Sequence, residues 1–499
     1  MFAVIQTRTQ VGIRALPVSV EVHLSNGLPQ FAIVGLPETV VKESKERVRS
    51  ALLNSNFEFP NGRITVNLAP ADIPKEGGRF DLPIAIGILV ASGQLETHIL
   101  DEYEFAGELA LNGSLRAIPA SLPFAYEAHL SQKKFILPVA NSAEAGQIKN
   151  AKLYPAKHLL EVAAHLKTGE ALTQHVHSNP HHATCDNAPD LADVIGQPQA
   201  KRALEIAAAG GHNLLLVGPP GTGKTMLAMR LPGIMPEMNE SEAIESATIR
   251  SIRNLATKAT DFYKRPFRQP HHTSSAISLV GGGSNPKPGE ISLAHNGVLF
   301  LDELPEFDRK VLEVLREPLE SGQIHIARAS RQASFPAKFQ LIAAMNPCPC
   351  GYAGSNKKTC SCRSEQIQRY QTKLSGPLLD RIDLHLQVHD LPHDALFRKY
   401  SEPKENTATV RQRVIDARHI QLKRQQTMNA ALQAKSLESH CSLENDERQL
   451  MMNAIEQLKL SPRASHRVLR VARTIADLAS ANTIQISHLA EALSYRGMV

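Results

Sequence analysis

The 499-residue sequence contains no tryptophan, few other aromatic residues and only six cysteines. Six cysteines in so long a chain do not make the disulfide framework that is typical of small secreted proteins. The apolar runs have the length of strands and fall well short of the roughly 18 residues of a membrane span. No basic segment precedes the apolar residues at the N-terminus. We therefore expect neither a membrane span nor a secretory signal, and a cytoplasmic protein.

Acidic residues are missing from one long segment and scarce in another. Residues 321–364 contain none and six Lys or Arg, and residues 246–289 contain only Asp261 against seven Lys or Arg. The net charge of the whole chain is only +6, so these two segments are much more basic than the rest of the sequence. Clustered basic charge predicts a polyanionic partner such as nucleic acid. A solvated basic face, or compensation for the charge of a bound nucleotide, is the alternative interpretation.

One segment has the pattern of a phosphate-binding loop. Residues 214–217 are apolar and predict a strand, residues 226–230 predict a helix, and between them lie Gly218, Pro219, Pro220, Gly221, Thr222, Gly223, Lys224 and Thr225. Glycine lets backbone N–H groups surround a phosphate, and the N-terminus of the following helix adds a positive dipole. The pattern predicts a nucleoside triphosphate site in which Lys224 reaches the β- and γ-phosphates and Thr225 binds Mg²⁺.

Two further apolar runs end in polar side chains. Residues 298–301 have the composition of a strand buried on both faces and lead directly into Asp302 and Glu303. We expect Asp302 to support Mg²⁺ and Glu303 to polarise the attacking water, which predicts an ATP hydrolase. A helix N-cap is the alternative role for these acids. Residues 340–345 form the second run, and Asn346 follows it directly. We expect the side-chain amide of Asn346 to orient the same water.

Two arginines are candidates for contact with the nucleotide. Arg381 is expected to reach the γ-phosphate bound by a neighbouring subunit, as an arginine finger does. An ion pair with Asp380 or Asp383 is its alternative role. Arg463 begins a predicted helix and is expected to contact nucleotide from the C-terminal part of the chain. The arginines that follow it at one-face spacing are expected to form a basic surface: Arg467, Arg470 and Arg473.

The pattern along the chain predicts a multidomain α/β protein of two to four domains. Residues 169–190 are polar and contain several His and Pro residues, and we interpret them as a linker, with metal binding by the histidines as the alternative. Residues 191–392 alternate strand and helix patterns, which predicts an α/β nucleotide-binding core. Residues 393–499 predict a helical domain.

The first 168 residues predict an α+β domain. A helical pattern covers residues 38–53, and short apolar runs of strand length occur at residues 31–34, 64–68, 84–90 and 135–138.

Four of the six cysteines form a paired cluster within a core insert, residues 348–362. They are candidates for a tetrahedral Zn²⁺ site: Cys348, Cys350, Cys360 and Cys362. The C-x-C spacing is tighter than the usual C-x₂₋₄-C, so ordinary loop thiols are the alternative. Cys185 and Cys441 are isolated.

Two segments are candidates for contact with a polyanionic partner. Residues 323–335 alternate around a short turn, which predicts a hairpin from which Arg328, Arg331 and His325 would contact phosphates. Residues 281–287 form a glycine-rich loop with one cation, Lys287. An edge hairpin and a plain turn are the alternatives.

The order of P-loop, Asp-Glu pair, Asn, Arg and second Arg resembles that of AAA+ ATPases, whose active sites lie between subunits. Longer motifs resemble the magnesium-chelatase type, and among these the ComM/YifB family of bacteria, over essentially the whole chain: residues 268–273, 281–283, 286–295, 346–351 and 472–478. The resemblance implies an ATP-driven hexameric DNA helicase that promotes branch migration during natural transformation, and it implies that the polyanionic partner of residues 281–287 and 323–335 is DNA. A protein-remodelling or chelatase-assembly ATPase acting on a polypeptide is the alternative, and aromatic pore residues would favour it.

The resemblance also assigns an architecture. It implies a Lon-protease-like (S5-type) α+β domain, a P-loop AAA+ core and an α-helical C-terminal lid of the magnesium-chelatase type. In the Lon-like part, Arg79 and Leu122 stand where a protease has its nucleophile and its lysine, so we expect no proteolysis. The domain is then expected to build the ring or to bind DNA.

Overall fold

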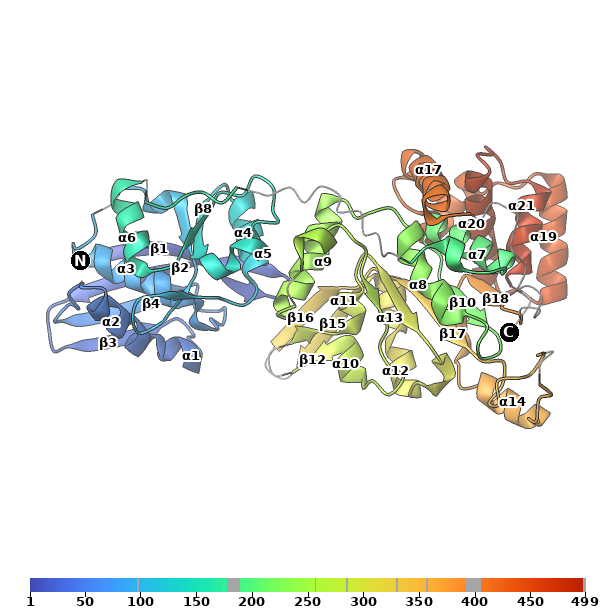
Figure 1. Ribbon diagram of the computed structural model, residues 1–499, viewed down its shortest axis with the longest axis horizontal. Helices are drawn as coiled ribbons and strands as arrows, with labels where there is room; N and C mark the ends of the chain where they lie inside the picture. The colour runs from blue at the N-terminus through green and yellow to red at the C-terminus, as the bar shows by residue number, and fades with distance from the viewer. Residues whose placement is uncertain are drawn as a thin grey trace. The chain divides into compact units, whose positions relative to one another are not determined.

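The computed structural model describes the chain except residues 97, 170, 177–188, 256, 284–285, 329–330, 356–357, 391–404 and 497–499. Most of the predicted linker and Cys185 lie outside the described residues, and for Arg328 and Arg331 only the backbone is described. The chain forms two compact units. The first contains residues 1–183 and 240–262, and the second contains residues 184–239 and 263–499 (Figure 1).

The first unit begins with a four-stranded sheet in the order β1-β2-β4-β3. Its strands are β1 (Phe2–Val11), β2 (Arg14–Ser25), β3 (Gln30–Val34) and β4 (Arg63–Ala69). β1, β2 and β4 pair antiparallel, whereas β3 runs parallel to β4. Buried and exposed residues alternate along β4, so one face of the sheet covers the core. The helices that follow are α1 (Thr39–Lys42), α2 (Ser44–Asn54) and α3 (Asp81–Ala91).

A smaller parallel sheet completes the first unit, in the order β5-β8-β9. The remaining elements are β5 (Tyr103–Phe105), β6 (Glu108–Leu109), β7 (Leu115–Arg116), α4 (Ser121–Leu130), β8 (Lys134–Pro138), α5 (Ser142–Ala145), β9 (Leu153–Ala156) and α6 (Leu159–Thr168). Helix α9 (Glu240–Ile252) comes from far along the chain and packs against α4. The apolar run at residues 84–90, expected as a strand, is instead part of helix α3, so that prediction is wrong.

The second unit is built on a parallel five-stranded sheet in the order β11-β14-β17-β10-β18. Every residue of β14 and β17 is buried, as expected for strands covered on both faces. The strands are β10 (Leu214–Val217), β11 (Phe267–Arg268), β14 (Val298–Leu301), β17 (Gln340–Met345) and β18 (Leu384–Gln387). This α/β architecture agrees with the predicted nucleotide-binding core.

Helices and two hairpins connect the strands of this sheet. The helices are α7 (Pro198–Gly210), α8 (Lys224–Ile234), α10 (Ala276–Val280), α11 (Glu290–Leu293), α12 (Arg309–Val314), α13 (Arg316–Ser321), α14 (Ser364–Gln371) and α15 (Gly376–Leu379). One hairpin pairs β12 (Gly281–Gly282) with β13 (Lys287–Pro288). The other pairs β15 (Gln323–Arg328) with β16 (Arg331–Pro336).

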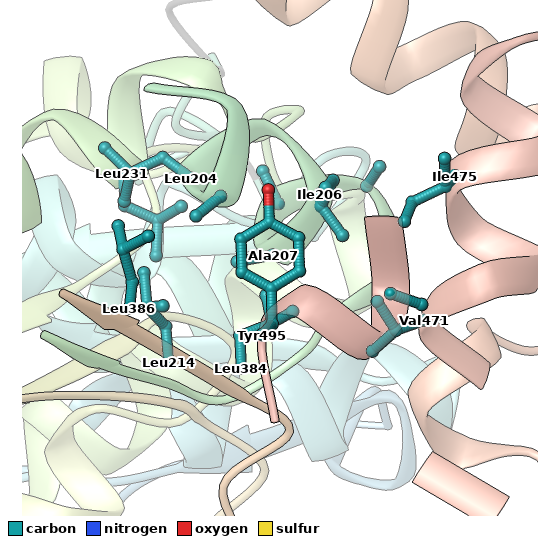
Figure 2. Close-up of a cluster of buried hydrophobic side chains, with 14 of the residues drawn as sticks. Leu204, Ile206, Ala207, Leu214, Leu231, Leu384, Leu386, Val471, Ile475 and Tyr495 are labelled. Atoms are coloured by element: carbon teal, nitrogen blue, oxygen red, sulfur yellow. The ribbon is translucent and has the colours of Figure 1, made fainter. Parts of the chain in front are cut away.

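The C-terminal helical segment, residues 407–494, packs on the same hydrophobic core as the sheet. Its helices are α17 (Thr407–Gln425), α18 (Ala434–His440), α19 (Asn445–Leu458), α20 (Pro462–Leu478) and α21 (Ile486–Ser494). Figure 2 shows Val471 and Ile475 of α20 and the ring of Tyr495 beside residues of α7, β10 and β18. Helix α7 packs against both α17 and α20. No helix among the described residues is both long and apolar enough to span a membrane.

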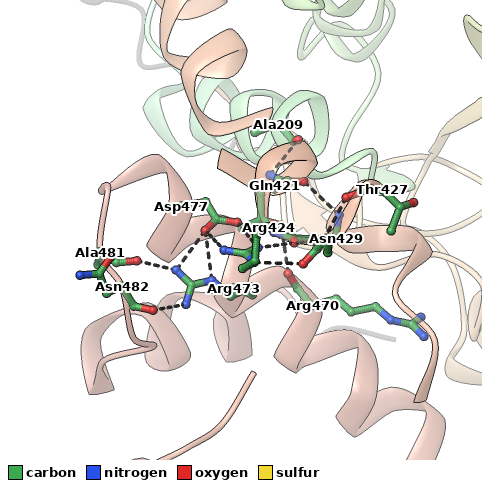
Figure 3. Close-up of polar contacts among 12 residues, drawn as sticks. Ala209, Gln421, Arg424, Thr427, Asn429, Arg470, Arg473, Asp477, Ala481 and Asn482 are labelled. Carbon is green, nitrogen blue, oxygen red and sulfur yellow. Dashed lines mark hydrogen bonds and ion pairs between the residues drawn. The ribbon is translucent and has the colours of Figure 1, made fainter. Parts of the chain in front are cut away.

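A buried ionic network holds the C-terminal helices together (Figure 3). The carboxylate of Asp477 accepts hydrogen bonds from Arg424 at 2.7 and 2.9 Å, from Arg473 at 3.1 Å and from Asn429 at 2.8 Å. Arg473 is 2% exposed, and Arg470 donates to the carbonyl of Leu432. The expected basic surface of Arg467, Arg470 and Arg473 is therefore wrong, because this side of α20 faces inward and is paired.

We expect Asp477→Ala to lower the free energy of unfolding by about 3–5 kcal/mol, because it leaves the buried guanidinium of Arg473 without its carboxylate. Urea denaturation of purified protein measures this loss. Glu405→Ala is the matched control, since it removes a carboxylate from a half-exposed pair with Arg413 and should cost at most about 1 kcal/mol. Equal losses in the two variants would contradict the structural importance of the Asp477 network.

Candidate active site

The loop between β10 and α8 has the backbone that the P-loop pattern requires. Gly221 and Gly223 have φ values of 79° and 85°, which side chains other than glycine rarely adopt. Gly218 is required for a different reason: a Cβ atom there would lie 2.3 Å from the carbonyl oxygen of Val388. A larger residue at position 218 would therefore push the P-loop away from Val388, which directly follows β18.

Lys224 begins α8 and is buried at the centre of this loop. Its ammonium donates to the carbonyl oxygens of Gly218 at 2.7 Å and Pro219 at 2.8 Å, and to Oδ1 of Asn346 at 3.3 Å. Burial lowers the pKa of Lys224, and the charges of Asp302, Asp390 and Glu303 oppose that shift. These contacts place a cation against the loop carbonyl oxygens and Asn346, within the electrostatic influence of three carboxylates.

Thr225 and Asp302 form a pair of oxygen ligands. The hydroxyl of Thr225 donates to Oδ2 of Asp302 at 2.7 Å, and Oδ1 of Asp302 accepts the backbone N–H of Glu303 at 2.9 Å. Hydroxyl and carboxylate oxygens are the hard ligands that Mg²⁺ prefers. The donor set therefore fits the predicted magnesium ion.

Glu303 has an unusual backbone and an accessible side chain. Its φ of 53° lies in the left-handed region, which costs a residue with a Cβ atom about 1–3 kcal/mol and is often found at functional sites. The carboxylate is 51% exposed, and its Oε2 lies 3.1 Å from Nδ1 of His272. Among the described residues His272 is therefore the partner that orients Glu303, and sequence reasoning gave it no role at the site.

Asn346 follows β17, which lies between β14 and β10 in the sheet. Because all five strands are parallel, their carboxyl ends meet at one edge, where open α/β sheets bind ligands. The structure brings together there five predicted site residues: Lys224, Thr225, Asp302, Glu303 and Asn346. Asp390, which follows β18 and acts electrostatically on Lys224, lies near them and was missed by the sequence reasoning.

Arg381 lies at the opposite end of the sheet. Its carbonyl oxygen accepts from the side chain of Asn213, directly before β10, whereas the P-loop directly follows that strand. A four-residue strand is about 13 Å long, so Arg381 is remote from the P-loop of its own chain. The guanidinium is 8% exposed and pairs with Glu320, not with Asp380 or Asp383, and its Nε has no hydrogen-bond partner among the described residues.

Arg463 lies in the first turn of α20, where its side chain is exposed. One helical turn further on, NH1 of Arg467 donates to the carbonyl oxygen of Arg381 at 3.4 Å. Residues four apart share a face of a helix. Arg463 and Arg381 therefore belong to the same end of the second unit, away from the P-loop.

The four clustered cysteines converge beside the P-loop. Their sulfur atoms all lie within 4.8 Å of one another, with separations of 3.4 Å between Cys348 and Cys350, 3.7 Å between Cys348 and Cys360 and 3.5 Å between Cys350 and Cys360. These distances match the roughly 3.8 Å edge of a sulfur tetrahedron around zinc. The cluster could therefore hold a metal ion.

The four thiols of the cluster do not share one environment. A backbone hydrogen bond favours the thiolate at Cys360 and at Cys362, but burial and the neighbouring cysteines outweigh it and raise the pKa of both. Backbone N–H groups, that of Tyr352 first and then that of Ser361, lower the pKa of Cys350 well below its usual value. A Cβ atom at Gly351 would lie 2.9 Å from Cδ of Pro220, so the cluster segment packs closely on the P-loop.

The two candidate DNA hairpins lie next to each other. A Cβ atom at Gly281 of β12 would lie 3.0 Å from Cδ1 of Ile326 in β15. Ile324 and Ile326 are buried, whereas His325 is exposed, so the predicted alternation holds along β15. Lys287 is exposed on β13. Arg328 and Arg331 are paired across the end of the β15–β16 hairpin, and their side chains lie outside the described part of the chain.

Three protein-family models match the chain in succession. The model described as magnesium chelatase, subunit ChlI, matches residues 190–396. A model of subunit ChlI of Mg-chelatase matches residues 20–141, and a model of the ChlI C-terminal region matches residues 404–496. The matches cover most of both units.

Relatives from several bacteria are similar over the full length. Competence protein ComM of Haemophilus influenzae is 51% identical over 100% of this chain and 98% of its own length. The uncharacterized protein YifB of Escherichia coli is 51% identical over 99% of this chain and 97% of its own. A more distant similarity, 22% identity over 42% of this chain and 66% of the relative, is to the magnesium-chelatase 38 kDa subunit of Cereibacter sphaeroides.

Proposed function

Since the chain belongs to the ComM/YifB family of magnesium-chelatase-like proteins, we propose that it is an ATP-driven DNA motor. In this proposal it is a helicase that promotes branch migration and the integration of donor DNA during natural transformation. The observation that carries the ATPase part is the convergence of Lys224, Thr225, Asp302, Glu303 and Asn346 at the carboxyl edge of the sheet. The name of the relative from Haemophilus influenzae supports the role in competence.

Each side chain of this edge has a distinct role in the proposed hydrolysis. The loop amides from Gly218 to Gly223 and the ammonium of Lys224 bind the phosphates, while Thr225 and Asp302 hold Mg²⁺. When bound, Mg²⁺ neutralises charge on the phosphates. Glu303 takes the proton of the attacking water, and Asn346 orients that water.

The position of Arg381 supports an active site shared between subunits. It lies at the amino end of β18, about one strand length from its own P-loop. A ring, which we propose to be a hexamer, would bring the Arg381 of one subunit to the nucleotide of the next, with Arg463 on the same side. In this assembly residues 1–168 form a Lon-like platform, residues 191–392 the AAA+ core and residues 393–499 the lid.

A polyanionic track is supported by the adjacent hairpins that carry Lys287, His325, Arg328 and Arg331. Their candidate contact residues are cationic or imidazole side chains, which bind phosphate oxygens. Aromatic residues of the kind that grip polypeptides are not among them. We therefore favour DNA over a polypeptide as the substrate on which the motor acts.

ATP hydrolysis measured with and without DNA, together with three-stranded branch migration, tests the proposed function. We expect single-stranded or forked DNA to stimulate hydrolysis and branch migration to require ATP. If an unfolded polypeptide stimulates hydrolysis and DNA does not, the protein is a protein-remodelling ATPase and the proposed DNA motor is wrong.

Neutralising the β15–β16 hairpin should weaken DNA binding. We expect Arg328→Ala/Arg331→Ala to lose a similar amount of affinity for every DNA sequence. The slope of the logarithm of the binding constant against the logarithm of the salt concentration should become shallower by about one unit per lost phosphate contact. Basal hydrolysis should persist while its stimulation by DNA falls. Fluorescence anisotropy with labelled DNA over a range of salt concentrations measures the slope.

The control for this variant is Arg309→Ala/Lys310→Ala, which removes two exposed cations at the start of α12. It changes the net charge equally but leaves the hairpin intact. An unchanged salt slope in the hairpin variant, or an equal change in both variants, would place the DNA path elsewhere.

We further propose that the four-cysteine cluster holds Zn²⁺ as a structural ion. Purified protein is expected to contain about one equivalent of metal, which Cys360→Ser/Cys362→Ser should lose. Metal analysis of dialysed protein measures the content. Cys441→Ala is the control, because this cysteine is buried and lies outside the cluster. Metal-free protein with full activity would show that these four cysteines are ordinary loop residues.

A further inference from the structure

The backbone that carries Arg381 is held between the sheet and the C-terminal helical segment. Its carbonyl oxygen accepts from Nδ2 of Asn213 at 2.9 Å and from NH1 of Arg467 at 3.4 Å. Asn213 directly precedes β10, whereas Arg467 comes from α20. The candidate finger is therefore attached to two parts of the second unit at a single peptide group.

A buried carboxylate joins these two attachments. Oδ1 of Asp383 accepts from NH1 of Arg467 at 2.5 Å, and Oδ2 accepts from the backbone N–H of Asn213 at 3.0 Å. Burial opposes ionisation of Asp383, but the ring of His212, whose Nδ1 lies 3.7 Å from Oδ2, and the charge of Arg467 hold the pKa of its carboxyl well below the usual range. A carboxylate that is 3% exposed needs its cation, so Arg467 is bound in place.

Beyond Arg467, helix α20 is fixed to the same end of the sheet. The hydroxyl of Thr474 lies 2.7 Å from Nε2 of His212, and it accepts from Nδ2 of Asn429 at 3.0 Å. Asn429 in turn donates to Asp477, the centre of the network in Figure 3. These contacts fix the position of α20 on the sheet, and Arg467 joins the helix in that position to the Arg381 segment.

We propose that Arg467 is a positioning residue for Arg381. Arg467 ties the finger segment to α20, so that the guanidinium of Arg381 is directed at the neighbouring nucleotide only while the C-terminal helices keep their place on the sheet. The inference rests on the proposed role of Arg381 between subunits. Arg467 does not touch the nucleotide in this proposal, because its NH1 is committed to Asp383 and to the carbonyl of Arg381.

Arg467→Ala is expected to lower kcat for ATP about tenfold while KM changes little, because a misplaced transition-state contact affects turnover and not ground-state binding. Arg467→Lys should recover part of the loss, since an ammonium can pair with Asp383, but a lysine does not hold its donor in the fixed position that the rigid guanidinium gives NH1 beside the carbonyl of Arg381. Binding of a fluorescent ATP analogue reports whether each variant is folded.

Arg413→Ala is the matched control. Arg413 of α17 makes an ion pair at 2.5 Å with Glu205 of α7, so it also joins the C-terminal helices to the core, but away from the finger segment. Arg202 keeps Glu205 paired in this variant. We expect wild-type turnover. A loss as large as that of Arg467→Ala would show that any weakened contact of these helices slows hydrolysis, and would overturn the specific role of Arg467.

Mixed assemblies separate the inference from the proposed function on which it rests. Arg467→Ala mixed with Glu303→Gln should regain hydrolysis, because one type of interface then carries an intact finger and an intact Glu303. Arg467→Ala mixed with Arg381→Ala should regain none. The reverse pattern would place Arg467 at its own subunit's nucleotide and overturn the inference. Full turnover by Arg381→Ala alone would instead refute the proposed finger.

Discussion

Glu303→Gln protein is expected to bind ATP and to hydrolyse it at least about 10²-fold more slowly than the wild type. The substitution keeps the shape of the side chain but removes the carboxylate that can accept a proton from water. It leaves the phosphate contacts of the loop and Lys224 unchanged. ATP binding by titration calorimetry and hydrolysis by phosphate release measure the two steps separately.

Lys224→Ala should fail at the earlier step. Its ammonium is placed among the loop carbonyls and Asn346 by three hydrogen bonds, and no other described cation shares those contacts. Without it the phosphates lose their charge partner, and we expect ATP binding to be lost. Glu306→Gln is the control for both variants, because it neutralises an exposed acid in the turn that follows Glu303. Equal loss of ATP binding in Glu303→Gln and Lys224→Ala would contradict the division of roles.

The strands that carry this site are predictable from sequence for a physical reason. A strand buried on both faces is a continuous apolar run, and the runs at residues 214–217, 298–301 and 340–345 coincide with β10, β14 and β17. The first run is followed by the glycine-containing loop that leads to Lys224, and the other two by Asp302 and Glu303 and by Asn346. Parallel pairing then brings those residues together without any further information.

Predictions from the sequence were wrong where buried residues show no periodic pattern. All residues of α3 except Val90 are buried, so its sequence shows neither the helical nor the alternating pattern, and a short apolar run of this kind is ambiguous. The arginines of α20 failed for a related reason. Their spacing places them on one face, but the inward direction of that face depends on Asp383 and Asp477, which sequence spacing does not reveal.

The missed residues of the site are those whose partners lie far away along the chain. His272 meets Glu303, Glu320 meets Arg381, and Asp390 acts on Lys224. None of the three stands in a local pattern that predicts such a contact. The packing of residues 240–262 with the first unit is also a long-range contact, and it interrupts a segment that the sequence pattern treats as continuous core.

Arg381→Ala is the second large effect that we expect, a fall in turnover of about 10³-fold with ATP binding retained. The variant should fold, because the partner that loses its cation, Glu320, is 58% exposed and stays hydrated. NH1 of the buried guanidinium donates to the carbonyl oxygen of Pro377 and NH2 pairs with Glu320, whereas Nε has no hydrogen-bond partner among the described residues. Arg381→Lys should restore little, since a lysine lacks the planar fork.

Glu320→Gln distinguishes a finger from an ion pair. If Arg381 acts on a neighbouring nucleotide, its pair with Glu320 competes with that contact, and Glu320→Gln should turn over ATP at least as fast as the wild type. If the ion pair itself is what matters, Glu320→Gln and Arg381→Ala should be equally slow. Phosphate release under saturating ATP decides between the two outcomes.

Mixing Arg381→Ala with Glu303→Gln tests the location of the finger directly. Each variant alone has every interface disabled, but in a mixed assembly an Arg381→Ala subunit followed by a Glu303→Gln subunit combines an intact Glu303 with an intact Arg381. We expect hydrolysis to reappear in proportion to such interfaces. No recovery, with subunit exchange verified by mass, would mean that Arg381 acts within its own chain. The strand length that separates it from its P-loop argues against that outcome.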